Sequence, residues 1–264
     1  MTPDRDGTAE AEFVKRRTSA PAGFFAGEAA GLRPLGAVPG GAPCAEVLAC
    51  DAVSLTLRRL RPVPPSPQAA RTLGARLAVT HDAGAGAFGA GPDGHSGPGF
   101  FGPLSNPLPM SLTPHRAWGP FYSAERLQPM AEMAAGQLDR ETRAVITSVI
   151  NRCAAGDFDD GDRPARLHGD LWSGNVVWTP DGVVLIDPAA HGGHRETDLA
   201  MLALFGCPYF AEIIEGYQRV HELRAGWAGR VGLHQLYPLL AHVVLFGSGY
   251  AGPVARAARR AGAR

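Results

Sequence analysis

Hydrophobic and polar positions along the chain predict a β-rich beginning followed by a mainly helical remainder. Apolar residues recur at helical spacing over 23–35, which predicts one helix near the start. Short apolar runs between polar or turn residues predict three strands, over 12–16, 46–49 and 52–60, with a turn at Cys50-Asp51. The first sixty or so residues therefore predict a small sheet accompanied by one helix.

A proline cluster from Arg61 to Pro67 interrupts this pattern. Proline fixes φ and cannot continue a helix, so the cluster is typical of a stiff connector. We place a boundary near residue 61, which gives an N-terminal unit over 1–61 and a C-terminal unit over 62–264. Apolar periodicity beyond the boundary predicts helices over 66–81, 120–136, 140–155, 195–205, 210–224 and 232–248.

Two segments of the C-terminal unit depart from helical periodicity. Residues 84–109 are dense in glycine and proline and predict a long loop. Loops of this length are often functional, although a sequence rich in alanine, glycine and proline throughout explains the composition equally well. The apolar runs 175–178 and 183–187 flank the turn sequence Thr-Pro-Asp-Gly, and they predict a β-hairpin.

Composition narrows the class of protein. The chain has 264 residues, 45% of them hydrophobic, and its 25 basic residues balance 25 acidic ones. A net charge of zero provides no field for nucleic acid or a membrane surface, so the expected partner is a small molecule. The N-terminus lacks an apolar signal core and no stretch reaches the ~18 apolar residues of a membrane span, so we expect a cytoplasmic protein.

Cysteine and histidine spacing predicts neither a disulfide framework nor a zinc site. The four cysteines are widely scattered and contain no CxxC pair, so we expect reduced and mostly buried thiols. His191 and His194 have the spacing of a metal-ligand pair, but the sequence shows no third ligand beside them.

The segment Leu-His-Gly-Asp-Leu-Trp-Ser-Gly-Asn over 167–175 carries the strongest chemical signal. Asp170 precedes Asn175 by five positions, the spacing of a kinase catalytic loop, and Asp187 ends the next apolar strand, directly before Pro188. Phosphoryl transfer needs a carboxylate to deprotonate the attacking hydroxyl and oxygen ligands that hold Mg²⁺ against the phosphates of ATP. Each feature alone is also ordinary turn structure, but their order and spacing together predict one metal-phosphate site.

Four further residues suit this chemistry less specifically. Lys15 in the first strand and Glu28 in the next helix suit a phosphate-binding pair, and two surface charges are the alternative. Asp198 could accept hydrogen bonds from the catalytic-loop backbone, or act as a charge at a helix N-terminus. Trp172 offers a flat apolar face on which a sugar can stack, or it packs the hairpin.

The strings over 167–175, 185–189 and 193–200 closely resemble the fructosamine kinase (ketosamine kinase) family. Landmarks elsewhere, among them Trp118 and the segment from His242 to Tyr250, extend the resemblance over nearly the whole chain. The family has the aminoglycoside phosphotransferase-like, protein-kinase-like fold. The resemblance therefore implies an α+β bilobal protein with a small β-rich N-lobe and a larger, mainly helical C-lobe.

The resemblance also implies roles for individual residues and a substrate class. Family substrates are ketosamines such as fructosyl-lysine or ribulosyl-lysine, whose phosphorylation on the sugar frees the amine, and the implied role is deglycation by a monomer or homodimer. The implied residues are Asp170 as base, Asn175 and Asp187 as Mg²⁺ ligands, Lys15 and Glu28 at the ATP phosphates, Trp172, His168 and His242 in the sugar pocket, Asp198 behind the catalytic loop, and Leu57, Arg58, Arg59 and Leu60 at the adenine.

One departure from the family keeps alternatives open. The family begins with two strands joined by a glycine-rich phosphate loop, whereas only fourteen residues precede Lys15 here and Gly7 is their sole glycine. We therefore expect an apparently truncated N-lobe: either the sequence lacks its first segment, or the protein has a real loss of the phosphate loop and an unusual, weaker hold on ATP. Besides a ketosamine kinase, the sequence admits a phosphotransferase for another alcohol, such as an aminoglycoside, and a non-catalytic domain that binds nucleotide or sugar weakly.

Overall fold

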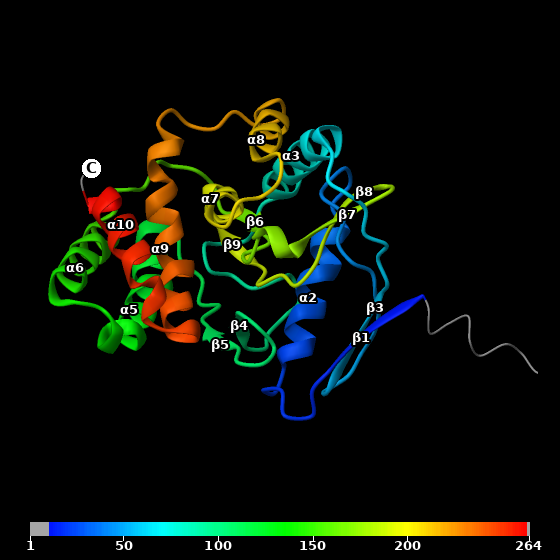
Figure 1. Ribbon diagram of the computed structural model, residues 1–264, viewed down its shortest axis with the longest axis horizontal. Helices are drawn as coiled ribbons and strands as arrows, with labels where there is room; N and C mark the ends of the chain where they lie inside the picture. The colour runs from blue at the N-terminus through cyan, green and yellow to red at the C-terminus, as the bar shows by residue number, and fades with distance from the viewer. Residues whose placement is uncertain (1–10, 263–264) are drawn as a thin grey trace, which may run out of the picture.

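A three-stranded antiparallel sheet and one helix form the smaller lobe of the computed structural model, which describes residues 11–262 (Figure 1). The side chains of Phe25, Leu32 and Leu55 are fully buried between helix and sheet, so the lobe has a core of its own. The strand order is β1-β3-β2, and the elements are β1 (Glu12–Arg16), α2 (Phe24–Gly36), β2 (Val47–Cys50) and β3 (Ser54–Arg58). All four were predicted, although β3 is shorter than expected. Gly7 lies outside the described residues.

The proline-rich segment that follows β3 contains no helix or strand. It leads into helix α3, whose first turn is capped by the Ser66 hydroxyl, which accepts a hydrogen bond from the Ala69 backbone N–H (3.2 Å). Proline at the first helical position suits this start because its missing N–H would have no partner there. The lobe boundary near residue 61 stays a prediction.

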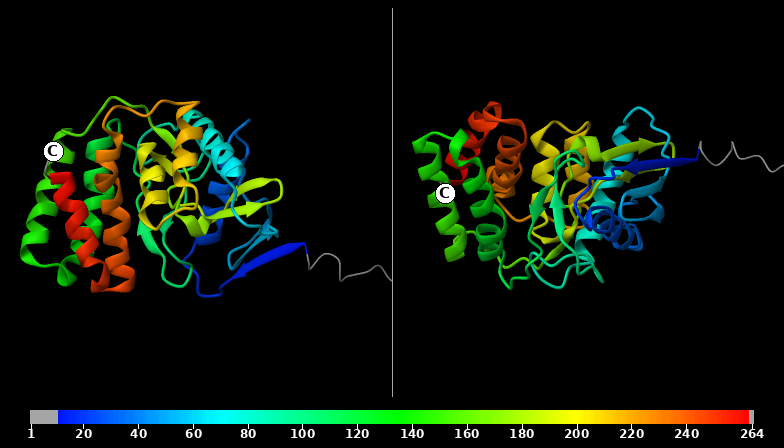
Figure 2. Two further views of the ribbon diagram at one scale, coloured as in Figure 1. Left: turned by 45° about the horizontal axis from the view of Figure 1, so that its top comes forward. Right: turned by 90° about the horizontal axis from the view of Figure 1, so that it is seen from below.

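Helices make up most of the larger lobe. Figure 2 shows α5, α6, α9 and α10 at the end far from the sheet, with α3, α7 and α8 nearer to it. The helices are α3 (Pro67–Asp82), α4 (Trp118–Phe121), the π-helix η1 (Tyr122–Leu127), α5 (Gln128–Ala134), the 3₁₀ turn η2 (Ala135–Gln137), α6 (Arg140–Ala155), the 3₁₀ turn η3 (Ser173–Asn175), α7 (Glu196–Leu204), α8 (Phe210–Gln218), α9 (Trp227–Phe246), the 3₁₀ turn η4 (Ser248–Tyr250) and α10 (Ala251–Gly262).

Several helices differ from the sequence prediction. The helix expected over 120–136 is divided into four pieces, with a π-helix before Pro129, which lacks the N–H needed for a regular i→i−4 bond. Helix α8 ends at Gln218 instead of 224, and α9 begins at Trp227, directly after Gly226 in a left-handed conformation (φ 79°). Helix α10 was not predicted, because its buried face consists mainly of alanines.

Three two-stranded ladders lie among these helices. The predicted hairpin is present, although its second strand ends at residue 185, so Asp187 follows the strand instead of ending it. The segment expected to be one long loop contains a short hairpin. The ladders pair β4 (Gly99–Phe101) with β5 (Leu108–Met110), β6 (Ala165–Leu167) with β9 (His191–Gly193), and β7 (Val176–Thr179) with β8 (Gly182–Leu185).

Strand β8 connects the larger lobe to the smaller one through its backbone. Leu185 N–H donates to the carbonyl of Pro43 (2.8 Å), and its carbonyl accepts from Ala45 N–H (2.9 Å). The hydroxyl of Thr80, from α3, accepts a hydrogen bond from Ala42 N–H (2.8 Å). These bonds fix the end of the hairpin beside the segment that precedes β2, so Asp187 emerges between the lobes.

The described residues include all four cysteines, and all are free thiols. Cys153 and Cys207 are buried, Cys44 is partly buried and Cys50 is exposed. Burial raises the pKa of Cys44 to about 12 and that of Cys207 to about 11, so both are protonated at neutral pH.

Among the helices of residues 11–262, none is both long enough and apolar enough to cross a membrane.

Helices α3 and α8 approach closely at Gly74, and this contact generates a prediction. A Cβ atom on Gly74 would lie 1.9 Å from the Ile213 carbonyl oxygen, which belongs to the backbone of α8. We expect Gly74→Ala to lower the free energy of unfolding by about 1–3 kcal/mol in urea denaturation, because the helices must separate. Gly136→Ala is the control, since a Cβ there has open space. Equal stability of the two variants would contradict this packing.

Candidate active site

A cavity of about 360 Å³ lies between the lobes. Its walls come from β1 and α2 of the smaller lobe, the catalytic loop and the residues after β8, the hairpin β4–β5, and α9. Seven residues predicted from the sequence line it, namely Lys15, Glu28, Asp170, Trp172, Asn175, Asp187 and His242. Segments that are far apart in the chain therefore meet in one space.

The predicted catalytic loop, over 168–175, turns sharply at Gly169 before it enters the cavity. Gly169 has φ 83°, and a Cβ there would lie 2.1 Å from the Ala189 carbonyl oxygen, so only glycine fits. At the far end of the loop, the Asn175 side-chain amide donates to the Asp170 carbonyl (2.7 Å). With its nitrogen bound to backbone, the amide oxygen of Asn175 remains as an acceptor.

Asp170 is surrounded by protein except where it meets the cavity. Burial, and then the negative charge of Asp187, raise the pKa of Asp170 to about 7, against the opposing hydrogen bond from Asn175. A carboxyl group with this pKa exchanges its proton near neutral pH. Asp170 therefore has the electrostatic setting of a general base.

Lys15 connects the two lobes at the inner end of the cavity. Its Nζ lies 2.7 Å from Glu28 Oε1 and 2.5 Å from Asp187 Oδ1. Burial acts to lower the pKa of Lys15, but the charges of Glu28 and Asp187 outweigh it and raise the pKa. The lysine is thus a fixed cation beside an aspartate whose side chain remains 40% exposed.

Asp187 occupies an unusual backbone conformation. Its φ of 56° is left-handed, a region in which aspartate occurs more often than most residues other than glycine. The conformation turns the chain away from the direction of β8 directly before Pro188. It leaves the Asp187 carboxylate lining the cavity together with the amide of Asn175.

Asp198 lies fully buried in the first turn of α7, behind the catalytic loop. Its two oxygens accept hydrogen bonds from the backbone N–H groups of His168 (2.8 Å) and Gly169 (2.9 Å), the kind of contact the sequence predicted. His81 Nε2, from the end of α3, lies 3.2 Å from the same carboxylate, and His81 Nδ1 lies 2.8 Å from the Tyr217 hydroxyl. Sequence reasoning missed His81 and Tyr217 as supports, because no local pattern relates α3 and α8 to the loop.

His168 was predicted to contact substrate, but the structure does not bring it to the cavity. Its side chain is buried, and Nε2 lies 2.8 Å from the carbonyl of Ile186, while Nδ1 accepts from Asp170 N–H (3.3 Å). His168 therefore ties the catalytic loop to the segment that carries Asp187.

The residues predicted to hold adenine also lie outside the lining of this cavity. Leu57 is buried in the core beneath the sheet, because it alternates with Leu55 on the face that α2 covers. Arg58 pairs with Glu46, and the guanidinium of Arg59 lies 6.0 Å from the ring centre of Phe13. No contact in the described residues connects Leu60 with the cavity.

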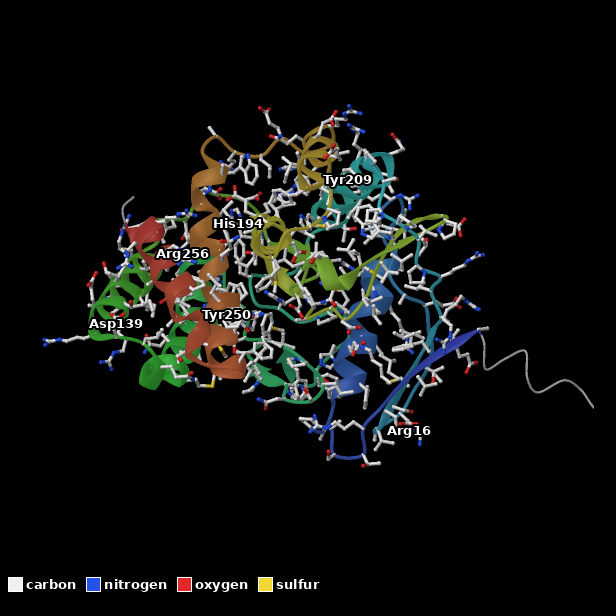
Figure 3. The ribbon with its side chains drawn as sticks, in the orientation of Figure 1. Arg16, Asp139, His194, Tyr209, Tyr250 and Arg256 are labelled. Carbon is white, nitrogen blue, oxygen red and sulfur yellow. The ribbon has the colours of Figure 1, made fainter. Side chains whose placement is uncertain are left out.

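The two histidines after Asp187 separate in the structure. His191 Nδ1 bonds to the Ala189 carbonyl (2.8 Å), whereas His194 meets Glu196 and His234, with the potential ligand atoms of the three within 4.8 Å of one another. Figure 3 shows His194 beside α9, the helix that carries His234 and that sequence spacing could not relate to it. Both oxygens of Glu196 already bind the guanidinium of Arg230 (2.5 and 2.8 Å), so we assign no metal here.

Part of the predicted loop over 84–109 lines one side of the cavity. Phe100 and Leu104, in or beside the β4–β5 hairpin, line it. Phe100 also packs on Phe24 of α2 (5.4 Å between ring centres), and the Arg17 guanidinium donates to the Leu104 carbonyl. The unusual length of the loop was the only sequence signal for this role.

Comparison with known proteins agrees with the architecture. The family model described as fructosamine kinase matches residues 5–261. A probable ketoamine kinase of Lactiplantibacillus plantarum is 34% identical over 251 residues, which cover 92% of this chain and 84% of that protein. Several other curated relatives align over less: the chain spans 49% of the probable ketoamine kinase of Klebsiella aerogenes and 33% of that of Enterococcus faecium.

Solved structures resemble the whole described fold. The crystal structure of a putative fructosamine-3-kinase from Thermobifida fusca superposes with a TM-score of 0.86 at 44% identity, covering 95% of this chain and 85% of that one. A macrolide 2'-phosphotransferase from Brachybacterium faecium has a TM-score of 0.56 at 13% identity, covering 93% and 83%, and shows the fold alone. The bilobal, kinase-like α+β architecture expected from the sequence is confirmed.

The hydrogen bonds at Asp198 generate a prediction about the loop. In Asp198→Asn an amide N–H₂ replaces one carboxylate oxygen and faces a backbone donor, so one buried N–H loses its acceptor. We expect the free energy of unfolding to fall by about 1–3 kcal/mol in urea denaturation. Asp181→Asn, on the exposed turn between β7 and β8, is the control. If both variants are as stable as the parent, Asp198 does not hold the loop.

Proposed function

The chain belongs to the fructosamine kinase family, and from this membership and the geometry of the cavity we propose that it transfers the γ-phosphoryl group of ATP to a sugar hydroxyl of a ketosamine. The observation that carries the proposal is the meeting of Asp170, Asn175, Asp187 and Lys15 in one cavity. These residue types are the ones phosphoryl transfer needs, and they come from both lobes.

Asp170 is proposed as the base. The attacking sugar hydroxyl would donate a hydrogen bond to its carboxylate, which takes the proton as the new O–P bond forms. The bond from the γ-phosphorus to the bridging oxygen breaks, and ADP leaves with that electron pair. Asp170 suits this step because its pKa of about 7 lets it accept a proton at neutral pH without binding it irreversibly.

Asn175 and Asp187 are proposed to hold Mg²⁺. The free amide oxygen of Asn175 and the partly exposed carboxylate of Asp187 are the hard oxygen donors that this ion prefers, so the donor set fits. When bound, Mg²⁺ supplies positive charge to the phosphate oxygens. Lys15, oriented by Glu28, provides a second cation on the side of the smaller lobe, where the triphosphate would lie.

The sugar is proposed to stack on the indole ring of Trp172. A Cβ on Gly174 would lie 2.2 Å from the indole, so the ring lies across the bare backbone of the loop that holds Asp170. A sugar stacked on this ring would have its hydroxyls close to the base. Phosphorylation of the sugar half of a ketosamine would destabilise the adduct, and the proposed role is release of the amine from glycated compounds.

Turnover tests the proposal. With fructosyl-lysine or ribulosyl-lysine and Mg-ATP, we expect ketosamine-dependent ADP release and a phosphorylated sugar by ³¹P NMR. Asp170→Asn should lower kcat by about 10²- to 10⁴-fold, because the amide cannot accept the proton. Asp181→Asn, on the exposed hairpin turn, should retain parental turnover. Equal rates for the parent and Asp170→Asn would refute the assignment of the base.

The pH profile gives a second test. Below pH of about 7 Asp170 becomes protonated and cannot accept the hydroxyl proton, so kcat/KM should fall about tenfold per unit of decreasing pH. Above that pKa the profile should reach a plateau until another group titrates. The measurement is steady-state kinetics at constant ionic strength from about pH 5 to about pH 9. An acidic limb that persists unchanged in the residual activity of Asp170→Asn would show that another group titrates.

A further inference from the structure

The hairpin β4–β5 packs against both lobes of the protein. Phe100 and Leu104 pack on the core of the smaller lobe. Phe101, Leu108 and Met110, in contrast, are buried in the core of the larger lobe. Figure 1 shows the hairpin between α2 and α9. The hairpin therefore bridges the two lobes along one side of the cavity, and its side chains belong to both cores.

One contact of the hairpin with the smaller lobe lies on α2, close to Glu28. Phe100 packs on Phe24 with ring centres 5.4 Å apart. Phe24 and Glu28 are four positions apart in α2, about one helical turn, and both line the cavity. Pro98, directly before β4, reaches the start of the same helix, since a Cβ on Gly23 would lie 3.0 Å from its ring. The hairpin thus meets the smaller lobe one turn from Glu28.

A second contact with the smaller lobe comes from Arg17. This residue follows Lys15 by two positions, and its guanidinium donates a hydrogen bond to the carbonyl of Leu104, in the turn between β4 and β5. Its Nε also donates to the Ser19 hydroxyl (3.1 Å). Hydrogen bonds from a charged donor are stronger than those between neutral groups. Arg17 therefore holds the turn of the hairpin beside the strand that carries Lys15.

The hairpin itself is apolar and stiff. Residues 99–110 include no charged side chain. Pro103, Pro107 and Pro109 fix φ at three positions, and Asn106 N–H donates to the Pro103 carbonyl (2.9 Å) to close the turn. The hairpin consequently presents apolar side chains to the cavity on a backbone with little freedom.

Two basic side chains border the hairpin, and both are bound to backbone. The Arg17 guanidinium is bound to the Leu104 carbonyl. His95 lines the cavity just before the hairpin, and its Nε2 lies 3.2 Å from the carbonyl of Pro98. These polar contacts hold the hairpin and the segment that leads into it. The surface that the hairpin turns to the cavity remains apolar.

Water can attack the γ-phosphorus of ATP in place of a sugar hydroxyl. The water oxygen then forms the new O–P bond, the bond to the bridging oxygen breaks, and ADP leaves with that electron pair. One proton of the water passes to Asp170, and the products are ADP and inorganic phosphate. A base and a bound cation act on water and on a sugar hydroxyl in the same way. Transfer stays ahead of hydrolysis only where access of water is restricted.

We propose that the hairpin β4–β5 shields the transferred phosphoryl group from water and that Arg17 is the positioning residue that holds it there. The inference rests on the proposed function for the place of the phosphates, beside Lys15 and Glu28. The apolar side chains of the hairpin offer water no hydrogen-bond partner at that end of the cavity. Contacts with both lobes fix the hairpin over it.

The partition of ATP between transfer and hydrolysis tests the inference. Sugar phosphate and inorganic phosphate are measured by ³¹P NMR in one reaction with Mg-ATP and fructosyl-lysine. Arg17→Met keeps the length of the side chain and removes its donors. We expect it to raise the ratio of inorganic phosphate to sugar phosphate about tenfold, because loss of a charged hydrogen bond changes a local equilibrium by about this factor. A general loss of activity would lower both products and leave the ratio unchanged.

Three further variants make the test specific. Arg17→Lys retains a donor, so its ratio should lie between those of the parent and Arg17→Met. Phe100→Ala removes the contact with Phe24 and should also raise the ratio. Arg16→Met is the matched control, since Arg16 is the adjacent, exposed cation at the end of β1, as Figure 3 shows, and it should keep the parental ratio.

The outcomes separate the inference from the proposed function. An unchanged ratio in Arg17→Met, or an equal rise in Arg16→Met, would overturn the inference even when sugar phosphate is formed. A parent that forms no sugar phosphate would refute the proposed function instead. Release of inorganic phosphate from Mg-ATP alone is then compared, and faster release by Arg17→Met than by the parent and Arg16→Met would still support shielding by the hairpin.

Discussion

A single buried carboxylate, that of Asp198, holds the backbone of the predicted catalytic loop in place at His168 and Gly169. The loop between β6 and the β7–β8 hairpin has no strand partner at His168 and Gly169, so the backbone donors there need another acceptor. Asp198 accepts both, and His81 positions the carboxylate from the opposite side. The position of Asp170 is thus determined by helices α3 and α7, which do not line the cavity, and a substitution in either helix can reach the site through this network.

The cavity also depends on contacts that join the lobes at several points. Backbone bonds of Leu185 hold β8 against the smaller lobe, Lys15 reaches Asp187, and the Arg17 guanidinium holds the carbonyl of Leu104. These contacts differ in chemistry: the first is a pair of neutral hydrogen bonds, and the second is an ion pair partly open to solvent. In the proposed function Lys15 would also contact a phosphate of ATP, and the backbone bonds of Leu185 would keep the lobes joined if the lysine left Asp187.

Sequence patterns were sufficient where the determining interactions are local. The five-residue spacing of Asp170 and Asn175 lies within one loop, and helical periodicity located α2, α3 and α6 closely. Patterns failed where distant segments decide the outcome. Strands β6 and β9 have three residues each and exist only because they pair across the loop, and the alanine face of α10 has little hydrophobic contrast. The side chain of His168 turned towards Ile186, which no spacing could reveal.

The position of Trp172 over Gly174 has a consequence for how such a site can change. The indole lies on backbone, so the height of the Trp172 ring above this loop is set by the absence of a side chain at Gly174. A methyl group there would lift the ring, and the distance from Asp170 to any stacked acceptor would change with it. Gly174 therefore acts as a spacer of minimal thickness beneath Trp172, and in the proposed function a substitution there would change the room for a sugar without altering Asp170 itself.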